Sequence, residues 1–180
     1  IHLTERSQTF VFSGISSRPV VSLNRSFSAP INLHFDQTPA DLVHIARNDA
    51  DLFSRWQAIT DLALPNLIEA VASVKQGKAV SFAPDLITAL LEIASDDSLE
   101  PAFRAQALAL PSESDIAREL GRDNDPDAIH KARGEVLAII AQGGQETFVR
   151  LAEDMRTEGE FTPDAASAGR RALRNSALLY

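Results

Sequence analysis

Alternating apolar and polar residues mark two short stretches near the start of the chain. Residues 8–12 read QTFVF and place Phe10 and Phe12 on one side. Residues 31–36 read INLHFD and alternate without a break. A period of two is typical of half-buried β-strands. We therefore predict a short antiparallel β segment within residues 1–37, although two or three such strands are marginal on their own.

From residue 38 onward the pattern is that of helices that begin at proline. Proline fits the first helical turn because its missing N–H is not needed there, and a preceding Thr or Asp can cap the exposed amides. Glycines fall where the helices should end. The long helices are predicted over residues 50–76, 84–95, 126–142, 145–158 and 163–180. Because no strict repeat period is present, we predict a mainly α protein in which residues 38–180 form an irregular, HEAT-like helical superhelix.

Two positions disturb this helical pattern. Pro65 interrupts the run WQAITDLAL, and because proline costs roughly 3 kcal/mol inside a helix we expect a kink or a break there. Gly143 and Gly144 separate two periodic stretches. We predict a loop at these glycines rather than one long helix.

The composition is that of an ordinary globular protein, and its net charge limits the classes of partner that we expect. Hydrophobic residues make up 44% of the 180 residues, charged residues 23%, and the net charge is −8. Residues 1–37 carry a net charge of +1 and residues 38–180 carry −9. Such a surface repels nucleic-acid phosphates and anionic membranes, so we expect neither partner. The absence of cysteine excludes disulfides and thiolate catalysis and suits a cytoplasmic protein, which is the location we expect.

No pattern of catalytic or metal-binding residues emerges. A catalytic zinc ion needs three ligands, two of them often one helical turn apart, and a serine nucleophile needs a GxSxG elbow. Neither HExxH nor GxSxG occurs. We interpret the four histidines as scattered imidazoles, and we assign no catalytic and no metal-binding residue and leave substrate-binding residues unassigned. These histidines are His2, His34, His44 and His130.

Three weaker sequence features are explained by roles in the fold rather than by a binding site. Residues 123–127 (DNDPD) resemble part of a calcium loop but lack its central glycine, and the Glu expected at position twelve is Gly134. We interpret these acids as helix caps. The arginines of residues 170–174 are expected to pair with nearby acids and a helix C-terminus, with a contact to an anion or to a peptide carboxylate as the alternative. Trp56 is expected to anchor the core.

Several motifs, taken in order, resemble one protein family. Residues 22–31 (SLNRSFSAPI) look like the segment that joins the β-sandwich to the helical domain in bacterial aminopeptidase N, of the zinc-dependent alanyl aminopeptidase family. Residues 48–58 (NDADLFSRWQA), residues 110–112 (LPS) and residues 170–175 (RRALRN) match further along. The resemblance covers essentially the whole chain, and its motifs are specific in combination rather than singly.

The resemblance implies a non-catalytic part of a zinc metalloaminopeptidase, an enzyme that removes N-terminal amino acids from peptides. In that family HExxH and a later Glu bind the zinc, and a glycine-x-methionine-glutamate-asparagine motif binds the free amine. Neither motif is present here. The resemblance therefore implies zinc in the parent enzyme and no cofactor in this segment.

It also implies that the partners are the catalytic domain and remaining helices of the same chain, together with peptide substrates. Residues 1–37 would be the end of a β-sandwich domain, and residues 38–180 would be the first part of a helical superhelix that shapes and covers the active-site cavity. A free-standing HEAT-like protein-interaction module remains the alternative. The first residue, Ile1, and the apolar run that ends at Tyr180 lead us to expect further polypeptide on both sides.

Self-association is the testable consequence of these apolar ends. Phe10 and Phe12 at one end, and Leu178 and Leu179 at the other, would present apolar faces that promote association. We predict that the sedimentation coefficient of the 180-residue chain increases with protein concentration. A monomer at every concentration would contradict this expectation.

Overall fold

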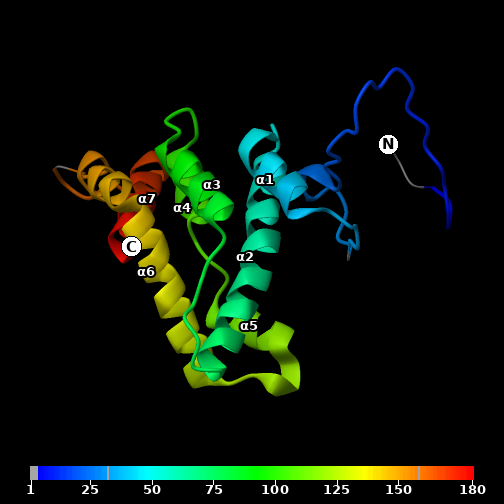
Figure 1. Ribbon diagram of the computed structural model, residues 1–180. Coiled ribbons are helices and arrows are strands. Elements are labelled where there is room, and N and C mark those ends of the chain that lie inside the picture. The colour runs from blue at the N-terminus through cyan, green and yellow to red at the C-terminus, as the bar shows by residue number, and fades with distance from the viewer. Residues whose placement is uncertain (1–3, 32, 158) are drawn as a thin grey trace.

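A computed structural model of the chain describes residues 4–31, 33–157 and 159–180 (Figure 1). Within these ranges the chain is mainly α, as predicted, and forms an array of helices. The elements are η1 (Arg25–Phe27), α1 (Pro39–Asn48), α2 (Leu52–Lys75), α3 (Pro84–Ser95), α4 (Pro101–Ala107), α5 (Glu113–Leu120), η2 (Gly121–Asp123), α6 (Pro126–Asp154) and α7 (Ala165–Leu179).

The helices pack in a sequence from one end of the molecule to the other. α2 contacts α1 and α6, and α6 in turn contacts α3, α5 and α7. The N-terminal arm projects from the α1 end, whereas the C-terminus lies at the opposite end beside α6 (Figure 1). The core between the helices includes these large aliphatic side chains, each at most 2% exposed: Ile59, Leu67, Val71, Leu86, Leu90, Ile93, Leu108, Ile116, Ile129, Val136, Ile140, Leu151 and Leu173.

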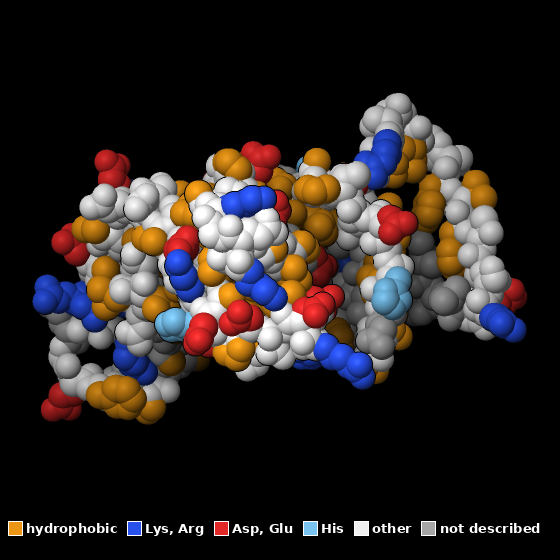
Figure 2. All heavy atoms as spheres, turned by 60° about the horizontal axis from the view of Figure 1, so that its bottom comes forward, with side chains coloured by type: hydrophobic (Ala, Val, Ile, Leu, Met, Phe, Trp, Pro, Cys, Tyr) orange, Lys and Arg blue, Asp and Glu red, His pale blue; other side chains and the backbone are white. Residues whose placement is uncertain are grey.

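The N-terminal part differs from the prediction, because the described residues 4–31 and 33–37 contain no strand. A strand is held by hydrogen bonds to a neighbouring strand, and residues 8–12 have no such neighbour among the described residues. Phe12 is 63% exposed and Ile31 54% exposed. Exposed hydrophobic side chains recur along the described part of the arm, from Phe10 to Phe35, and several are visible in Figure 2. Asn32, which the predicted second strand includes, lies outside the described residues.

The predicted loop at Gly143 and Gly144 is wrong, because α6 runs through both glycines. A Cβ atom on Gly144 would lie 2.7 Å from Cε2 of Phe148 and would collide with Leu91 of α3. A Cβ atom on Gly143 would lie 3.3 Å from Ile87, also of α3. These glycines therefore allow α3 to approach α6 closely, and the gain in packing offsets their low helix propensity.

Pro65 does not break α2, which is continuous from Leu52 to Lys75. Pro65 is exposed, so water can reach the carbonyl that its missing N–H leaves without a donor. The side-chain amide of Asn66 donates to the Leu62 carbonyl at 2.8 Å in the same turn. The buried face of the helix supplies the packing that outweighs the local cost.

Capping side chains define where the helices begin. Thr38 and Asp41 form a reciprocal capping box at α1, and Ser112 and Asp115 form another at α5. Asp125 caps α6 through the Ala128 N–H at 3.1 Å. The expectation that a Thr or Asp before the first proline of a helix caps that helix is confirmed at Thr38 and Asp125. In the part of the chain that the structure describes, each helix is either too short or too polar to span a lipid bilayer.

Two buried arginines bind the C-terminal ends of preceding helices. Arg55 of α2 donates from Nε to the Ala46 carbonyl of α1 at 2.8 Å. Arg104 of α4, which is 2% exposed, donates from Nε to the Ala94 carbonyl of α3 at 3.0 Å. Each guanidinium thus satisfies a carbonyl that has no helical partner and lies at the negative end of a helix dipole.

We predict that Arg104→Ala lowers the free energy of unfolding by about 2 kcal/mol or more, because it leaves the buried Ala94 carbonyl without its donor and opens a cavity. The matched control is Arg118→Ala, since Arg118 is exposed and pairs with Asp115 on the surface. That change should cost less than about 0.5 kcal/mol. Urea denaturation measures both, and an Arg104→Ala chain as stable as the control would contradict the role assigned to Arg104.

Candidate functional site

The residues singled out by their chemistry do not gather at one place. His130 pairs with Glu113 on the surface at 2.9 Å, and His44 lies beside Asn48 at the end of α1. His34 lies near the joint described below, and His2 is outside the described residues. The described parts of the chain contain no group of three or more His, Asp or Glu side chains that could hold a metal ion.

The arginines of residues 170–174 are engaged with backbone carbonyls. Arg170 donates to the Asp154 carbonyl at 2.6 Å, and Arg174 donates to the Ala152 carbonyl at 3.1 Å. Both carbonyls belong to the last turn of α6, which is the helix C-terminus expected for this cluster. Trp56 is half-buried and its ring centroid lies 5.7 Å from that of Phe53.

The densest set of polar contacts joins residues 18–29 to the beginnings of α1 and α2. We call this region the joint, and it consists of residues 18–29 together with Asp41, Asp49 and Asp51. Arg18 binds Asp41 with both guanidinium NH2 groups, at 2.8 and 2.7 Å, one to each carboxylate oxygen. Arg25 donates to Asp49 at 2.9 Å. Each basic residue of the segment is thus matched to an acid at a helix end.

Asp41 is the more deeply placed of these acids and is 5% exposed. The hydrogen bond from Arg18, followed by those from Thr38, holds the pKa of the Asp41 carboxyl well below its usual range. The carboxylate therefore serves two purposes. It completes the capping box of α1 and it receives the planar guanidinium in a bidentate pair, the strongest geometry for this kind of contact.

Asp51 connects the joint to α2 by four hydrogen bonds. Its carboxylate accepts from the backbone N–H and hydroxyl of Ser54, at 3.0 and 2.8 Å, and so caps the helix. It also accepts from the backbone N–H and hydroxyl of Ser26, at 2.8 and 3.0 Å. Burial would raise the pKa of Asp51, but these hydrogen bonds outweigh it and lower that pKa to about 2.

The turn that Asp51 holds has an unusual backbone. Asn24, Ser26 and Phe27 have φ values of 50°, 55° and 49°, in the left-handed region that non-glycine residues seldom adopt. The Asn24 side chain closes the turn by accepting from the Ala29 N–H at 2.9 Å and donating to the Ala29 carbonyl at 3.0 Å. The ring of Phe27 packs on that of Phe53 with centroids 5.3 Å apart. These contacts oppose the strain of the turn and keep it on α2.

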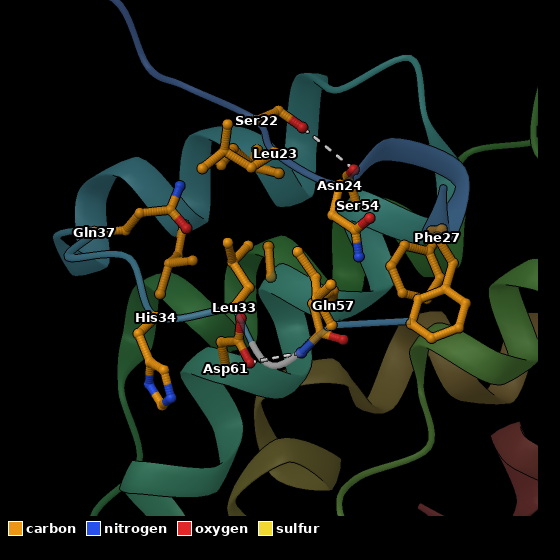
Figure 3. Close-up of a pocket in the computed structure, with 15 residues that line it drawn as sticks. Ser22, Leu23, Asn24, Phe27, Leu33, His34, Gln37, Ser54, Gln57 and Asp61 are labelled. Carbon is orange, nitrogen blue, oxygen red and sulfur yellow. Dashed lines mark hydrogen bonds between the residues drawn. The ribbon is translucent and has the colours of Figure 1, made fainter. Parts of the chain in front are cut away.

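A cavity of about 410 Å³ lies beneath the joint, between the described residues 22–31 and 33–37 on one side and the helices α1 and α2 on the other (Figure 3). Its apolar lining comes from both sides: Leu23, Phe27, Ile31 and Leu33 of the segment, and Leu42, Ile45, Phe53 and Ala58 of the helices. Polar groups from both sides line it as well: Ser22, Asn24, His34, Gln37, Ser54, Gln57 and Asp61.

Among the described residues that line the cavity, Asp61 is the one with a carboxylate side chain. Its Oδ1 accepts from the Gln57 amide at 2.7 Å, and both side chains project from α2 toward the cavity (Figure 3). Asp61 is an exposed residue, and the desolvation of its carboxyl on the cavity side raises the pKa of that carboxyl above its usual value. Sequence reasoning overlooked both the cavity and Asp61, because residues from two distant stretches form the walls.

Comparison with protein families divides the chain in two. A family of domains of unknown function described as ARM repeats, DUF3458_C, matches residues 39–180. A second family of domains of unknown function, DUF3458, described as having an Ig-like fold, matches residues 1–36.

Proteins of named function align with nearly the whole chain. Aminopeptidase N of Caulobacter vibrioides is 40% identical over 174 residues, and those of Haemophilus influenzae and Escherichia coli are 29% and 28% identical over 180 residues. These alignments cover 97%, 100% and 100% of this chain but 20% of each relative. The resemblance to bacterial aminopeptidase N is thereby confirmed.

A solved structure supports the fold. The crystal structure of Legionella pneumophila aminopeptidase A in complex with aspartic acid superposes with a TM-score of 0.73 at 24% identity. The match covers 92% of this chain and 20% of that one.

We predict that Asp51→Ala loosens the joint as well as the start of α2. Asp164→Ala is the matched control, because Asp164 caps α7 through the Ser167 N–H at 2.9 Å but touches no part of the joint. Both changes should lower the melting temperature, since both remove a cap. Only Asp51→Ala should speed amide hydrogen exchange at Ser26, because the Ser26 N–H donates to Asp51. Equal exchange at Ser26 in both variants would contradict the role assigned to Asp51 in the joint.

The pH dependence of stability provides a second test of Asp51. Its pKa falls from 3.8 to about 2 on folding, so the stabilisation that its ionised form supplies is complete above about pH 4 and is lost as the pH falls toward 2. Acid unfolding of Asp51→Ala, followed by circular dichroism between pH 5 and 2, should show a shallower slope than that of the unchanged chain. Identical slopes would show that Asp51 is not linked to folding in this way.

Proposed function

This chain belongs to the DUF3458_C family of ARM-repeat domains, and from that membership we propose that it is a scaffold region of an aminopeptidase N-type enzyme that removes N-terminal amino acids from peptides. The observation that carries the proposal is the alignment of nearly the whole chain with aminopeptidases N, at up to 40% identity. The chain spans about a fifth of the length of these relatives, so the activity, the peptide substrates and the partners are proposed for a longer protein.

In this proposal the chain has two parts with different roles. Residues 1–37 belong to the end of a β-sandwich, and residues 38–180 begin a helical superhelix that shapes and covers the cavity in which peptides are cleaved. The joint supports this division, because its ion pairs hold the segment that leads from one part into the other. Excluding water and large substrates from such a cavity is a task for a rigid cover rather than for reactive groups.

Zinc enters the proposal only as the metal of the complete enzyme. The described residues do not fit a zinc site, because no three of their His, Asp or Glu side chains come together. No catalytic step is therefore assigned to these residues. The partners we propose are the catalytic domain and the further helices of the same polypeptide, and a cytoplasmic location stays a prediction.

A chimera tests the proposed function. We would replace the 174-residue stretch that aligns in aminopeptidase N of Caulobacter vibrioides by the corresponding stretch of this chain. A control chimera would carry the equivalent stretch of the Escherichia coli relative. We predict that the first chimera hydrolyses alanyl-p-nitroanilide with kcat/KM within about tenfold of the control.

Two results would contradict the proposal. One is a first chimera that folds, by circular dichroism and gel filtration, but has no activity while the control is active. The other is turnover of the same substrate by the 180-residue chain alone in the presence of zinc.

A further inference from the structure

We propose that the joint is a latch with two states. In the docked state, which is the one described above and the major one, residues 18–29 lie on the beginnings of α1 and α2. In the released state this segment leaves the helices, and both helices stay folded. The latch belongs to the chain itself and does not depend on the proposed role in an aminopeptidase. Three observations point to it: the strain of the turn, the exposure of the segment and the way in which three aspartates divide their hydrogen bonds.

The docked turn carries backbone strain that the released segment loses. Asn24, Ser26 and Phe27 all have positive φ, and this is costly because the left-handed region brings Cβ close to the following carbonyl oxygen. Asn tolerates the region better than most residues, whereas a bulky residue such as Phe seldom adopts it. Strain of this kind persists only where the surrounding contacts impose it. The turn therefore relaxes once those contacts are lost.

The contacts that impose the strain bury little of the segment. Phe27, whose ring packs on that of Phe53, is 55% exposed, and η1 contains no buried residue. The side chains of Arg18 and Arg25 are 69% and 52% exposed in their ion pairs. Exposed ion pairs contribute modestly to stability and are weakened by salt. Segments with few buried apolar groups open locally at a lower free energy than global unfolding.

The helices keep their own caps when the segment leaves. Asp41 accepts from the Thr38 N–H at 3.1 Å within the capping box of α1. Asp51 caps α2 through the N–H and hydroxyl of Ser54. Asp49 accepts from the Asp51 N–H at 2.8 Å. Each aspartate thus has a partner in its own stretch of chain, so release is a local opening and not the first step of global unfolding.

The latch gives the N-terminal arm a pivot. Residues 4–17 lie before the joint and are exposed throughout. Release therefore lets this part of the arm turn relative to the helices without disturbing their aliphatic core. A partner that binds the arm better in the released state shifts the latch toward that state, by the difference between its affinities for the two states.

Native-state hydrogen exchange of the 180-residue chain, followed by NMR, measures the latch. The Ala29 N–H donates to the Asn24 side chain at 2.9 Å, so its exchange reports the opening of the turn. The N–H of Leu90, in the buried part of α3, reports global unfolding. We expect opening at Ala29 to be at least about a hundredfold more frequent than at Leu90. Equal opening at both amides, or exchange of Ala29 at the rate of a free peptide, would overturn the proposal.

Glycine and alanine at position 26 test the strain. Ser26→Gly and Ser26→Ala both lose the hydroxyl and keep the N–H that donates to Asp51, but glycine adopts positive φ without steric cost. After correction for intrinsic exchange rates, opening at Ala29 should be at least about threefold rarer with glycine than with alanine. Opening that is as frequent with glycine as with alanine, or more frequent, would contradict the strained latch.

Ser28 provides the matched control, because its φ is −63° and needs no glycine. There Ser28→Gly should open the turn about twofold more often than Ser28→Ala, since glycine gains more freedom on release. The same preference for glycine at both positions would show that strain at Ser26 is not the cause.

Salt should act on the latch and spare the core. Raising NaCl from about 0.1 to 1 M shortens the screening length from about 10 to 3 Å. We expect opening at Ala29 to rise at least about threefold and opening at Leu90 to change less than about twofold, because the ion pairs of Arg18 and Arg25 are exposed. Opening at Ala29 that does not respond to salt would show that these pairs do not hold the docked state.

Discussion

The placement of carboxylates at the beginnings of helices is the interaction on which this structure depends. A carboxylate at the N-cap or in the first turn of a helix has more lone pairs than the helix end requires, because the helix offers it only one or two free donors. Asp41 and Asp51 use the remaining oxygen positions to hold a segment from a distant part of the sequence. The same atoms therefore begin a helix and fix a tertiary contact.

Arginines perform the complementary task at the ends of helices. Arg55, Arg104 and Arg174 each donate from Nε to a carbonyl in or next to the last turn of the preceding helix. These carbonyls are unpaired in the isolated helix, and their partial negative charge attracts a guanidinium. Because each contact joins a helix to its neighbour, the array is held at the helix ends as well as by its aliphatic core. This gives an irregular stack a defined geometry without a strict sequence repeat.

The features predicted correctly from the sequence are those that local chemistry determines. Thr38 and Asp125 lie at helix starts because capping involves residues within one turn. The features missed depend on distant residues. A loop was predicted at Gly144 because the close approach of α3 cannot be seen locally, and strands were predicted where residues 8–12 find no neighbour to pair with. Asp51 caps α2, but its bonds to Ser26, 25 positions upstream, leave no local signal in the sequence.

Distance measurements between two spin labels test the central claim that the joint holds its segment in one position on α2. The chain contains no cysteine, so cysteines introduced at Ser28 and Glu69, both exposed, can be labelled without background. Double electron–electron resonance should give a single narrow distance distribution between the segment and the helix. A broad distribution, like that of a label on an untethered arm, would contradict the claim.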